Sequence, residues 1–321
     1  MTTKPTTDEL IKQPPGSQAT DDNVDDDAEP PPTKTPLYQA INAQRYQRQE
    51  IIKDIQGLTG YWLICYVSGR YCAIDRDDTV PFVDLLHNVL QNQDLDLLLH
   101  TGGGDIDAAE KLISMVRNKV GPALLRIVVP DFAKSAGTLM VLGADRVVMS
   151  DTSELGPIDP QVSLADANGN RIPHSVQSYL DAYEEHTATL KIEPDNVAAQ
   201  TMLRKLDPAT VKLFQAVKNR ARRFAEDHLT RGMFSEGGNS TLAAGELLDT
   251  KRWQSHGQMI SWADAQAEPI GLHVDYLDPS LEEWQKYWQL YCLQRLAVGD
   301  RQKLFESAYA SLIIEGHAAL G

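Results

Sequence analysis

Two short apolar runs, each followed by a turn of small residues and then a helical pattern, constrain the fold of this chain most. The first is LDLLLH (95–100), which leads into TGGGD (101–105). The second is LLRIVVP (124–130), which leads into DFAKSAG (131–137) and the apolar segment TLMVLGA (138–144). Apolar runs this short, flanked by turn residues, predict buried strands rather than helices. Strand–turn–helix units repeated this closely predict an α/β fold, with a parallel sheet and right-handed crossovers.

The flanking segments extend the same pattern. Apolar residues at three- to four-residue spacing between Leu37 and Ile55 predict a helix with one buried face. YWLICYV (61–67) predicts a buried strand directly after it, and a helix is expected through Val83 and Leu90. The other expected elements are a strand at RVVM (146–149), helices over 174–230 with breaks near Pro194 and Pro208, a helix starting near Ser240, and C-terminal helices over 280–296 and 300–315.

The negative charge of the chain is concentrated at its beginning. The 321 residues carry a net charge of −15, and residues 1–36, with eight acidic residues and three lysines, contribute −5 of it. This segment holds seven of the 17 prolines and few large apolar residues. It cannot bury enough surface to offset the entropy of ordering it, so we predict a disordered, acidic, Pro-rich tail. The remainder divides into one core domain over 37–278 and a helical extension over 279–321.

Composition also excludes several classes of function. An acidic protein repels phosphate backbones, so we expect no nucleic-acid partner. No apolar run approaches the roughly 18 residues that span a bilayer, and the first residues do not resemble a secretory signal, so we expect no membrane association. Cys65, Cys72 and Cys292 lack metal-ligand spacing and are interpreted as reduced thiols of a cytoplasmic protein, with no metal or other cofactor.

The two turns contain the residues that could do chemistry. TGGGD (101–105) could be a tight turn, a phosphate-binding loop or an oxyanion hole; it lacks the spacing of a phosphate-binding loop, and Asp105 would repel a phosphate. Ser135 follows a strand and begins an apolar helix, which suits a nucleophile or a helix cap. A cap does not account for the small residues around Ser135, nor for the glycine-rich turn one unit earlier.

The segments HTGGGDIDAAEKL and VPDFAKSAGTLMVLGADRVVMSDTSELGPIDPQV resemble the serine dehydrogenase proteinase family. That family belongs to the Clp peptidase and crotonase-like superfamily, to which signal peptide peptidase A is distantly similar. The resemblance covers about residues 40–275, and 95–162 is its specific part. It implies a Clp/crotonase-like spiral of ββα units with added helices and a nucleophilic serine at Ser135.

The resemblance also implies the other parts of a serine peptidase site. The backbone N–H of Ala136 and that of Gly104, or of its neighbour Gly103, would form the oxyanion hole. Asp159 in LGPIDPQ matches the acid, and His256 in RWQSH aligns with a Trp-x-His element of the family, with one extra residue. The alternatives left open are Asp151 as the acid, His100 or His174 as the base, and a serine–lysine dyad with Lys191, Lys205 or Lys212.

The expected function is therefore a cytoplasmic serine peptidase that cleaves polypeptides through an acyl-enzyme on Ser135. The resemblance implies a homo-oligomer and allows an ATPase or other protein partner, for which the acidic tail and the C-terminal extension could provide docking sites. Two alternatives stay open. One is a catalytically weak Clp-like scaffold subunit that acts in a partner-dependent assembly. The other is a crotonase-type acyl-CoA enzyme, because the same two amides can hold a thioester enolate.

Overall fold

A computed structural model describes residues 34–165, 171–249, 251–253, 255 and 257–317. The described residues divide into two units, one that ends at Ile41 and one that begins at Asn42. In the first unit only the helix α1 (Pro36–Ile41) and the two residues before it are described. The predicted disordered tail over 1–36 therefore lies almost wholly outside the described residues. The helix expected between Leu37 and Ile55 is present, interrupted at Asn42 before α2 (Ala43–Thr59).

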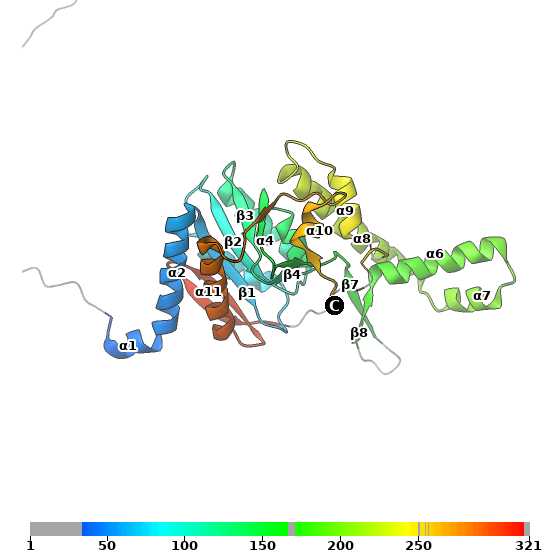
Figure 1. Cartoon of the computed structure of the whole chain (residues 1–321). Helices are drawn as coiled ribbons and strands as arrows, with labels where there is room; N and C mark the ends of the chain where they lie inside the picture. Colours follow the sequence, from blue (N-terminus) through cyan, green and yellow to red (C-terminus); the bar gives the residue numbers. More distant parts are fainter. Residues whose placement is uncertain (1–33, 166–170, 250, 254, 256, 318–321) are drawn as a thin grey trace, which may run out of the picture. The chain divides into compact units, whose positions relative to one another are not determined.

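A seven-stranded sheet is the centre of the second unit, in the order β10-β5-β3-β2-β1-β11-β12 (Figure 1). The first five strands in this order run parallel, which confirms the predicted parallel sheet. The last two form an antiparallel hairpin against β1. The strands are β1 (Trp62–Ser68), β2 (Leu95–His100), β3 (Leu125–Val128), β5 (Arg146–Met149), β10 (Val274–Tyr276), β11 (Gln302–Ser307) and β12 (Ser311–Glu315).

Helices cover both faces of this sheet. On one face, residues such as Ile64 and Tyr66 of β1 pack into a large core with α3 (Thr79–Leu86), α4 (Ile106–Val120) and α5 (Ala136–Val141). On the other face, their neighbours in β1 pack against α2 and α11 (Glu282–Ala297), which lie side by side (Figure 1). Burial on both faces explains why these strands are continuous apolar runs rather than alternating ones.

The C-terminal segment corrects one prediction. The first expected helix is present as α11, but the helix over 300–315 is wrong, because these residues form β11 and β12. Lys303 and Glu306 gave β11 a polar pattern, yet both side chains are buried and ion-paired, one toward each face of the sheet. Because β11 pairs with β1, the C-terminal segment is part of the central sheet and is not purely helical.

Residues 161–231 form a second small core beside the sheet. The hairpin of β7 (Gln161–Ala165) and β8 (Arg171–Ser175), which was not predicted, precedes α6 (Val176–Ile192), α7 (Val197–Arg204) and α8 (Pro208–Arg231). These helices break near Pro194 and Pro208 as expected. Val176, Leu180 and Phe214 are in their shared apolar cluster. The helix expected near Ser240 is α9 (Ser240–Leu247).

Several short elements complete the chain. They are the 3-10 helix η1 (Arg76–Asp78), α10 (Trp262–Gln266), and a small sheet of β4 (Phe132–Ala133), β6 (Glu154–Leu155) and β9 (Ile260–Ser261). Within the described ranges, no helix combines the length and the apolar character needed to cross a membrane.

Candidate active site

The two glycine-bearing turns lie against each other at the carboxyl ends of β2 and β3. Thr101, which follows β2, forms a parallel bridge with Ala133 of β4. The Thr101 N–H donates to the carbonyl oxygen of Phe132 at 3.1 Å, and the Lys134 N–H donates to that of Thr101 at 3.0 Å. Neighbouring parallel strands place their carboxyl ends at one edge of a sheet, where open α/β folds bind ligands. The bridge thus brings the first turn beside Ser135.

Ser135 occupies a strained backbone conformation between β4 and α5. Its φ of 51° and ψ of −113° are unusual for a residue with a side chain. Although Ser135 is at the N-cap position of α5, its hydroxyl makes no capping hydrogen bond. A sharp, strained strand-to-helix turn also presents the nucleophilic serine of α/β-hydrolases. This geometry favours a reactive serine over a helix cap. A capping serine needs no strained backbone, and its hydroxyl would accept a hydrogen bond from the helix.

Gly103 and Gly104 pack too closely for any side chain. A Cβ at Gly103 would lie 2.7 Å from the Lys134 carbonyl oxygen and 3.0 Å from the Ser135 Cβ, and φ is +101°. A Cβ at Gly104 would lie 2.4 Å from the backbone N and O of Ile74, and φ is +152°. The first glycine therefore contacts the serine turn, and the second contacts the loop before η1.

The backbone amides of the two turns differ in whether they are already used. The Gly103 N–H donates to the Thr101 hydroxyl at 3.1 Å. Within the described residues, the N–H groups of Gly104 and Ala136 donate to no protein acceptor. The Ala136 nitrogen would lie 3.2 Å from a Cβ on Gly103, so it is beside the glycine turn. Of the two glycines considered for the oxyanion hole, Gly104 is therefore the one with a free donor.

The Lys134 side chain anchors the turn that contains Ser135. Its amine lies 3.1 Å from the Glu154 carboxylate, and it donates to the carbonyl oxygens of Leu155 at 3.2 Å and Gln258 at 3.3 Å. The side chain is 12% exposed, and burial lowers the pKa of its amine although Glu154 opposes the shift. A third carbonyl, that of Gly257, is 3.5 Å from the amine. The serine turn is thereby tied to β6 and to the chain just before β9.

The two candidate acids lie in different surroundings. Asp159 is 6% exposed and accepts a 2.8 Å hydrogen bond from the hydroxyl of Ser175, the N-cap of α6. Asp151 is exposed, and the hydroxyl of Tyr276 on the edge strand β10 donates to it at 3.0 Å. Asp159 is thus a buried, oriented carboxylate, whereas Asp151 belongs to the surface of the sheet edge.

The candidate bases are separated by their surroundings. His256, the first choice, lies outside the described residues. His100 is buried on the α11 side of the sheet, with its Nδ1 3.2 Å from the Tyr291 hydroxyl, and burial lowers its pKa to about 3. His174 is exposed in β8 opposite Val162. The lysines considered for a dyad are exposed on or beside the helices α6 to α8: Lys191, Lys205 and Lys212.

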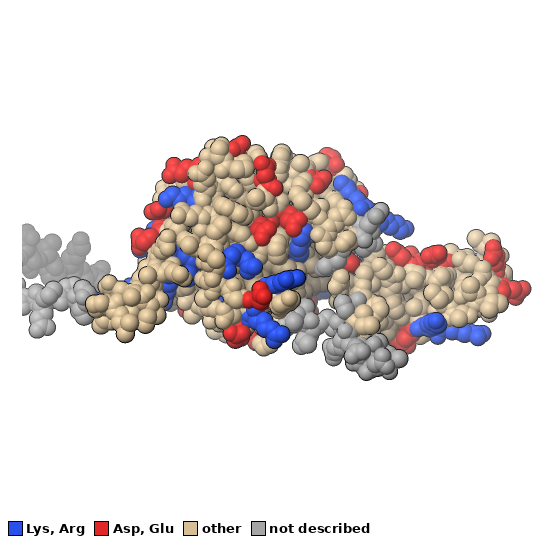
Figure 2. Space-filling view, turned by 60° about the horizontal axis from the view of Figure 1, so that its bottom comes forward, with Lys and Arg blue, Asp and Glu red and all other residues tan. Residues whose placement is uncertain are grey.

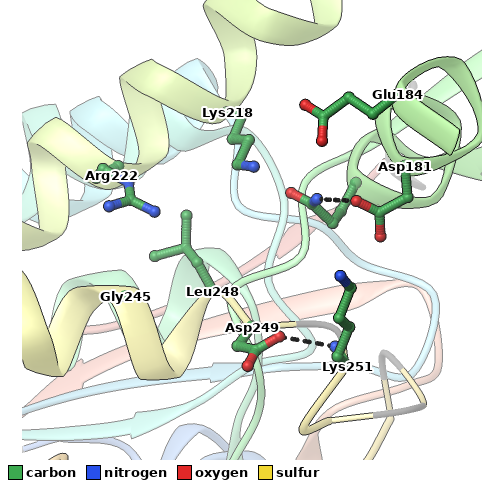
Figure 3. A pocket seen from close by; sticks show the side chains of 9 residues that line it. Asp181, Glu184, Lys218, Arg222, Gly245, Leu248, Asp249 and Lys251 are labelled. Carbon is green, nitrogen blue, oxygen red and sulfur yellow. Dashed lines mark hydrogen bonds between the residues drawn. The ribbon is translucent and has the colours of Figure 1, made fainter. Parts of the chain in front are cut away.

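A charged pocket of about 380 Å³ lies between α6, α8 and the end of α9 (Figure 3). Sequence reasoning did not identify it. Its lining includes Asp181 and Glu184 from α6, Lys218 and Arg222 from α8, and Lys251. The pocket borders α6, the helix that Ser175 caps. On the face drawn in Figure 2, acidic and basic side chains are interspersed over the described residues, without a broad area of one sign. The prediction that no nucleic acid is bound stays a prediction.

Comparison with known proteins places this geometry in a family. The model of the ClpP-like SDH-type serine proteinases matches residues 52–234, more than half of the chain. The uncharacterized protein MJ0137 of Methanocaldococcus jannaschii is 27% identical over 221 residues, which cover 69% of this chain and 66% of that protein. MJ1495 of the same organism is 28% identical over 92 residues, 29% of this chain and 31% of that protein. The chain thus spans just under two thirds of the first relative and about a third of the second.

Two solved structures are similar at lower levels. One is the 1510-N membrane-bound stomatin-specific protease in a serine-to-alanine variant, with a TM-score of 0.43 and 15% identity over 71% of this chain and 84% of that one. The other is a lysine-to-alanine variant of the same protease with a substrate peptide, with a TM-score of 0.34 and 14% identity over 71% and 99%. At these TM-scores the likeness transfers no function. The family match and the observed sheet confirm the predicted Clp/crotonase-like α/β fold.

Proposed function

The chain belongs to the ClpP-like SDH-type serine proteinases, and from that premise we propose that it hydrolyses peptide bonds through an acyl-enzyme on Ser135. The observation that carries this proposal is the turn itself. Ser135 is held at positive φ with its hydroxyl uncommitted to a cap, and two amides beside it have no protein acceptor within the described residues. Serine peptidases need this combination of an accessible nucleophile and unused donors.

In the proposed reaction, the Ser135 Oγ attacks the substrate carbonyl carbon while a base takes the hydroxyl proton. The carbonyl oxygen becomes an oxyanion, which accepts hydrogen bonds from the N–H groups of Gly104 and Ala136. The base then gives the proton to the leaving amine, the C–N bond breaks, and an ester on Ser135 remains. A water molecule, deprotonated by the same base, hydrolyses that ester and restores the serine.

For the base we propose His256, with Asp159 as the group that orients it. The Lys134 amine contacts the carbonyl oxygens of Gly257 and Gln258, the two residues that follow His256 in the chain. Asp159 supports the assignment because its carboxylate is buried and oriented by Ser175. The alternatives are weaker. His100 is held neutral by burial and bonded to Tyr291, while His174 and Asp151 are exposed.

A fluorophosphonate probe, which reacts with activated serines, tests this proposal. The wild-type protein should be labelled at Ser135, and Ser135→Ala should abolish the labelling. His256→Gln and Asp159→Asn should slow it, with the larger loss from the histidine. The matched control is Ser235→Ala, which removes an exposed serine outside the site and should leave labelling unchanged. Undiminished labelling of Ser135→Ala would refute the nucleophile, and unchanged rates in the other two variants would refute their roles.

We also propose that the substrate is a polypeptide, that the protein is a cytoplasmic homo-oligomer, and that a partner such as an ATPase supplies its substrate. Size-exclusion chromatography with light scattering tests the oligomer, and a strictly monomeric protein would count against it.

The two alternative functions from the sequence analysis can be distinguished by experiment. A correctly folded wild-type protein without any labelling would favour a scaffold, and clear thermal stabilisation by an acyl-CoA would favour a crotonase-type enzyme.

A further inference from the structure

A buried lysine from the C-terminal hairpin lies behind the glycine turn. Lys303 in β11 is 1% exposed, and its amine donates to Asp75 at 2.9 Å and to Asp78 at 2.7 Å. Asp78 is fully buried and also accepts from the Tyr66 hydroxyl at 3.1 Å. A charged amine this deep is stable only with such partners. The three charges therefore depend on one another, and the proposed chemistry uses none of them.

The two carboxylates shape the loop that runs into η1. Asp75 caps η1 by accepting from the Asp77 N–H at 2.9 Å, and the Asp75 N–H donates to Asp78 at 3.0 Å. This reciprocal capping box fixes the backbone from residue 75 to 78. Lys303 contacts both members of the box, so its amine holds the box against β11.

The residue directly before the box contacts the proposed oxyanion turn. The Ile74 N–H donates to the Gly103 carbonyl oxygen at 2.8 Å, and the Asp105 N–H donates to that of Ile74 at 2.9 Å. These two bonds flank Gly104, whose backbone packs directly on Ile74. The contacts with the Ile74 backbone therefore fix the direction of the free Gly104 N–H. A continuous set of contacts leads from Lys303 through the capping box to that amide.

We propose that Lys303 is a positioning residue of the peptidase: with Asp75 and Asp78, it holds the loop of Ile74 so that the Gly104 N–H points at the developing oxyanion. This inference rests on the proposed function, because it assigns a use to the Gly104 amide. Backbone bonds also tie the loop to the hairpin, from Gly69 to Gln302 and from Ala73 to His317. They precede Ile74, whereas the lysine acts on the residues that follow it.

The test compares Lys303→Met with a matched variant on the same strand. Arg48→Met breaks the other buried ion pair of β11, with Glu306, on the opposite face of the sheet. Both variants leave buried carboxylates without their cation, but only the first touches the loop of Ile74. The fluorophosphonate reaction at Ser135 is resolved into kinact and KI, because the probe's oxygen takes the oxyanion position.

Removing an oxyanion donor lowers catalysis by roughly 100- to 1,000-fold. Displacing one without removing it should lower kinact by about 10-fold or more in Lys303→Met, with KI almost unchanged. Arg48→Met should keep the wild-type kinact, and Lys303→Arg should recover much of the loss. If Lys303→Met does not fold, Asp75→Asn provides the same comparison. Asp75 is 27% exposed and asparagine has the same shape, so this variant should fold. Equal kinact values for the Lys303 and Arg48 variants would overturn the proposal.

Amide hydrogen exchange separates this inference from the proposed function. Exchange of a peptide covering residues 101–106 should rise more in Lys303→Met than in Arg48→Met, because the turn loses its support. If the wild-type protein is not labelled at all, the proposed peptidase fails, and exchange still reports whether Lys303 holds the turn. Labelling of the wild-type protein at Ser135 with equal kinact in both variants refutes the positioning role alone, whatever the exchange.

Discussion

Replacing Gly104 by alanine should disable the site by moving one amide. A Cβ at this position would lie 2.4 Å from the backbone N and O of Ile74 and 3.0 Å from the Ala73 Cβ. Backbone atoms of a neighbouring segment cannot rotate aside as a side-chain end can, so the turn itself must move. Two hydrogen bonds hold the turn against Ile74, one from the Ile74 N–H to the Gly103 carbonyl oxygen at 2.8 Å and one from the Asp105 N–H to the Ile74 carbonyl oxygen at 2.9 Å. A movement that relieves the clash lengthens both bonds.

The size of the effect follows from two contributions. A residue with a side chain at φ +152° is strained by about 1–3 kcal/mol, which lowers the stability of the fold. Loss of one oxyanion donor raises the reaction barrier by about 3–4 kcal/mol, or roughly 100- to 1,000-fold in rate. Gly104→Ala should therefore react with the fluorophosphonate at least about 100 times more slowly than wild type, while thermal unfolding still shows a folded protein.

Gly102→Ala is the matched control for this variant. A Cβ at Gly102 finds nothing within 4 Å. Gly102 is also not among the glycines with positive φ, so the backbone there tolerates a side chain. Gly102→Ala should keep the wild-type rate. A Gly104→Ala protein that reacts with the probe as fast as wild type would refute both the donor assignment and the reasoning from close packing.

Three further predictions concern stability and the proposed catalytic carboxylate, Asp159. Thr138 is fully buried, with its hydroxyl 2.9 Å and 2.8 Å from the carbonyl oxygens of Ala133 and Gly156. Thr138→Val should lower the free energy of unfolding by about 1–3 kcal/mol in urea titrations, whereas the exposed Thr201→Val should change it by less than about 0.5 kcal/mol. Burial lowers the pKa of His228 to about 4 from its usual 6.5. The folded state then favours the neutral ring, so stability should fall as pH drops from about 6.5 to 4, and less so in His228→Gln. Asp159→Asn should slow probe labelling without unfolding the protein, as judged by circular dichroism; an unfolded variant would make Asp159 structural.

The central sheet could be predicted because its signals are local and agree with one another. The runs at 95–100 and 125–130 are buried and mostly apolar, and their one charged pair, Asp96 with Arg126, is formed between the two strands themselves. The glycines at 103 and 104 indicated a tight turn from the sequence, and the structure gives the reason, because only glycine fits at these two positions. The position of Ser135 between a strand and a helix could be predicted, whereas its role as a nucleophile stays a prediction. In each case the deciding contact lies within one or two strand–helix units.

The features that sequence reasoning missed depend on partners far away in the chain. Lys303 and Glu306 indicate a solvated surface when seen alone, yet both are buried in β11, where a helix over 300–315 was predicted. Each is buried because its partner, Asp78 or Arg48, lies more than 200 residues earlier. The hairpin β7–β8 begins within the specific block of the resemblance, yet its pairing was not predicted. Nothing in the pattern of a single strand reports such a partner.

The family match covers the two turns but not every residue that contacts them. The matched residues, 52–234, include Ser135, both free amides and Asp159. They do not include the carbonyls of Gly257 and Gln258 that hold Lys134, nor Lys303 behind the glycine turn. A segment limited to the matched residues would hold the proposed nucleophile and both proposed oxyanion donors but would leave Asp78 buried without its cation. A buried carboxylate without a partner forces the surrounding chain to rearrange, and here the surrounding chain includes the loop that orients Gly104. The segments outside the family match, which also contain the proposed base His256, are therefore expected to be needed for full activity at Ser135.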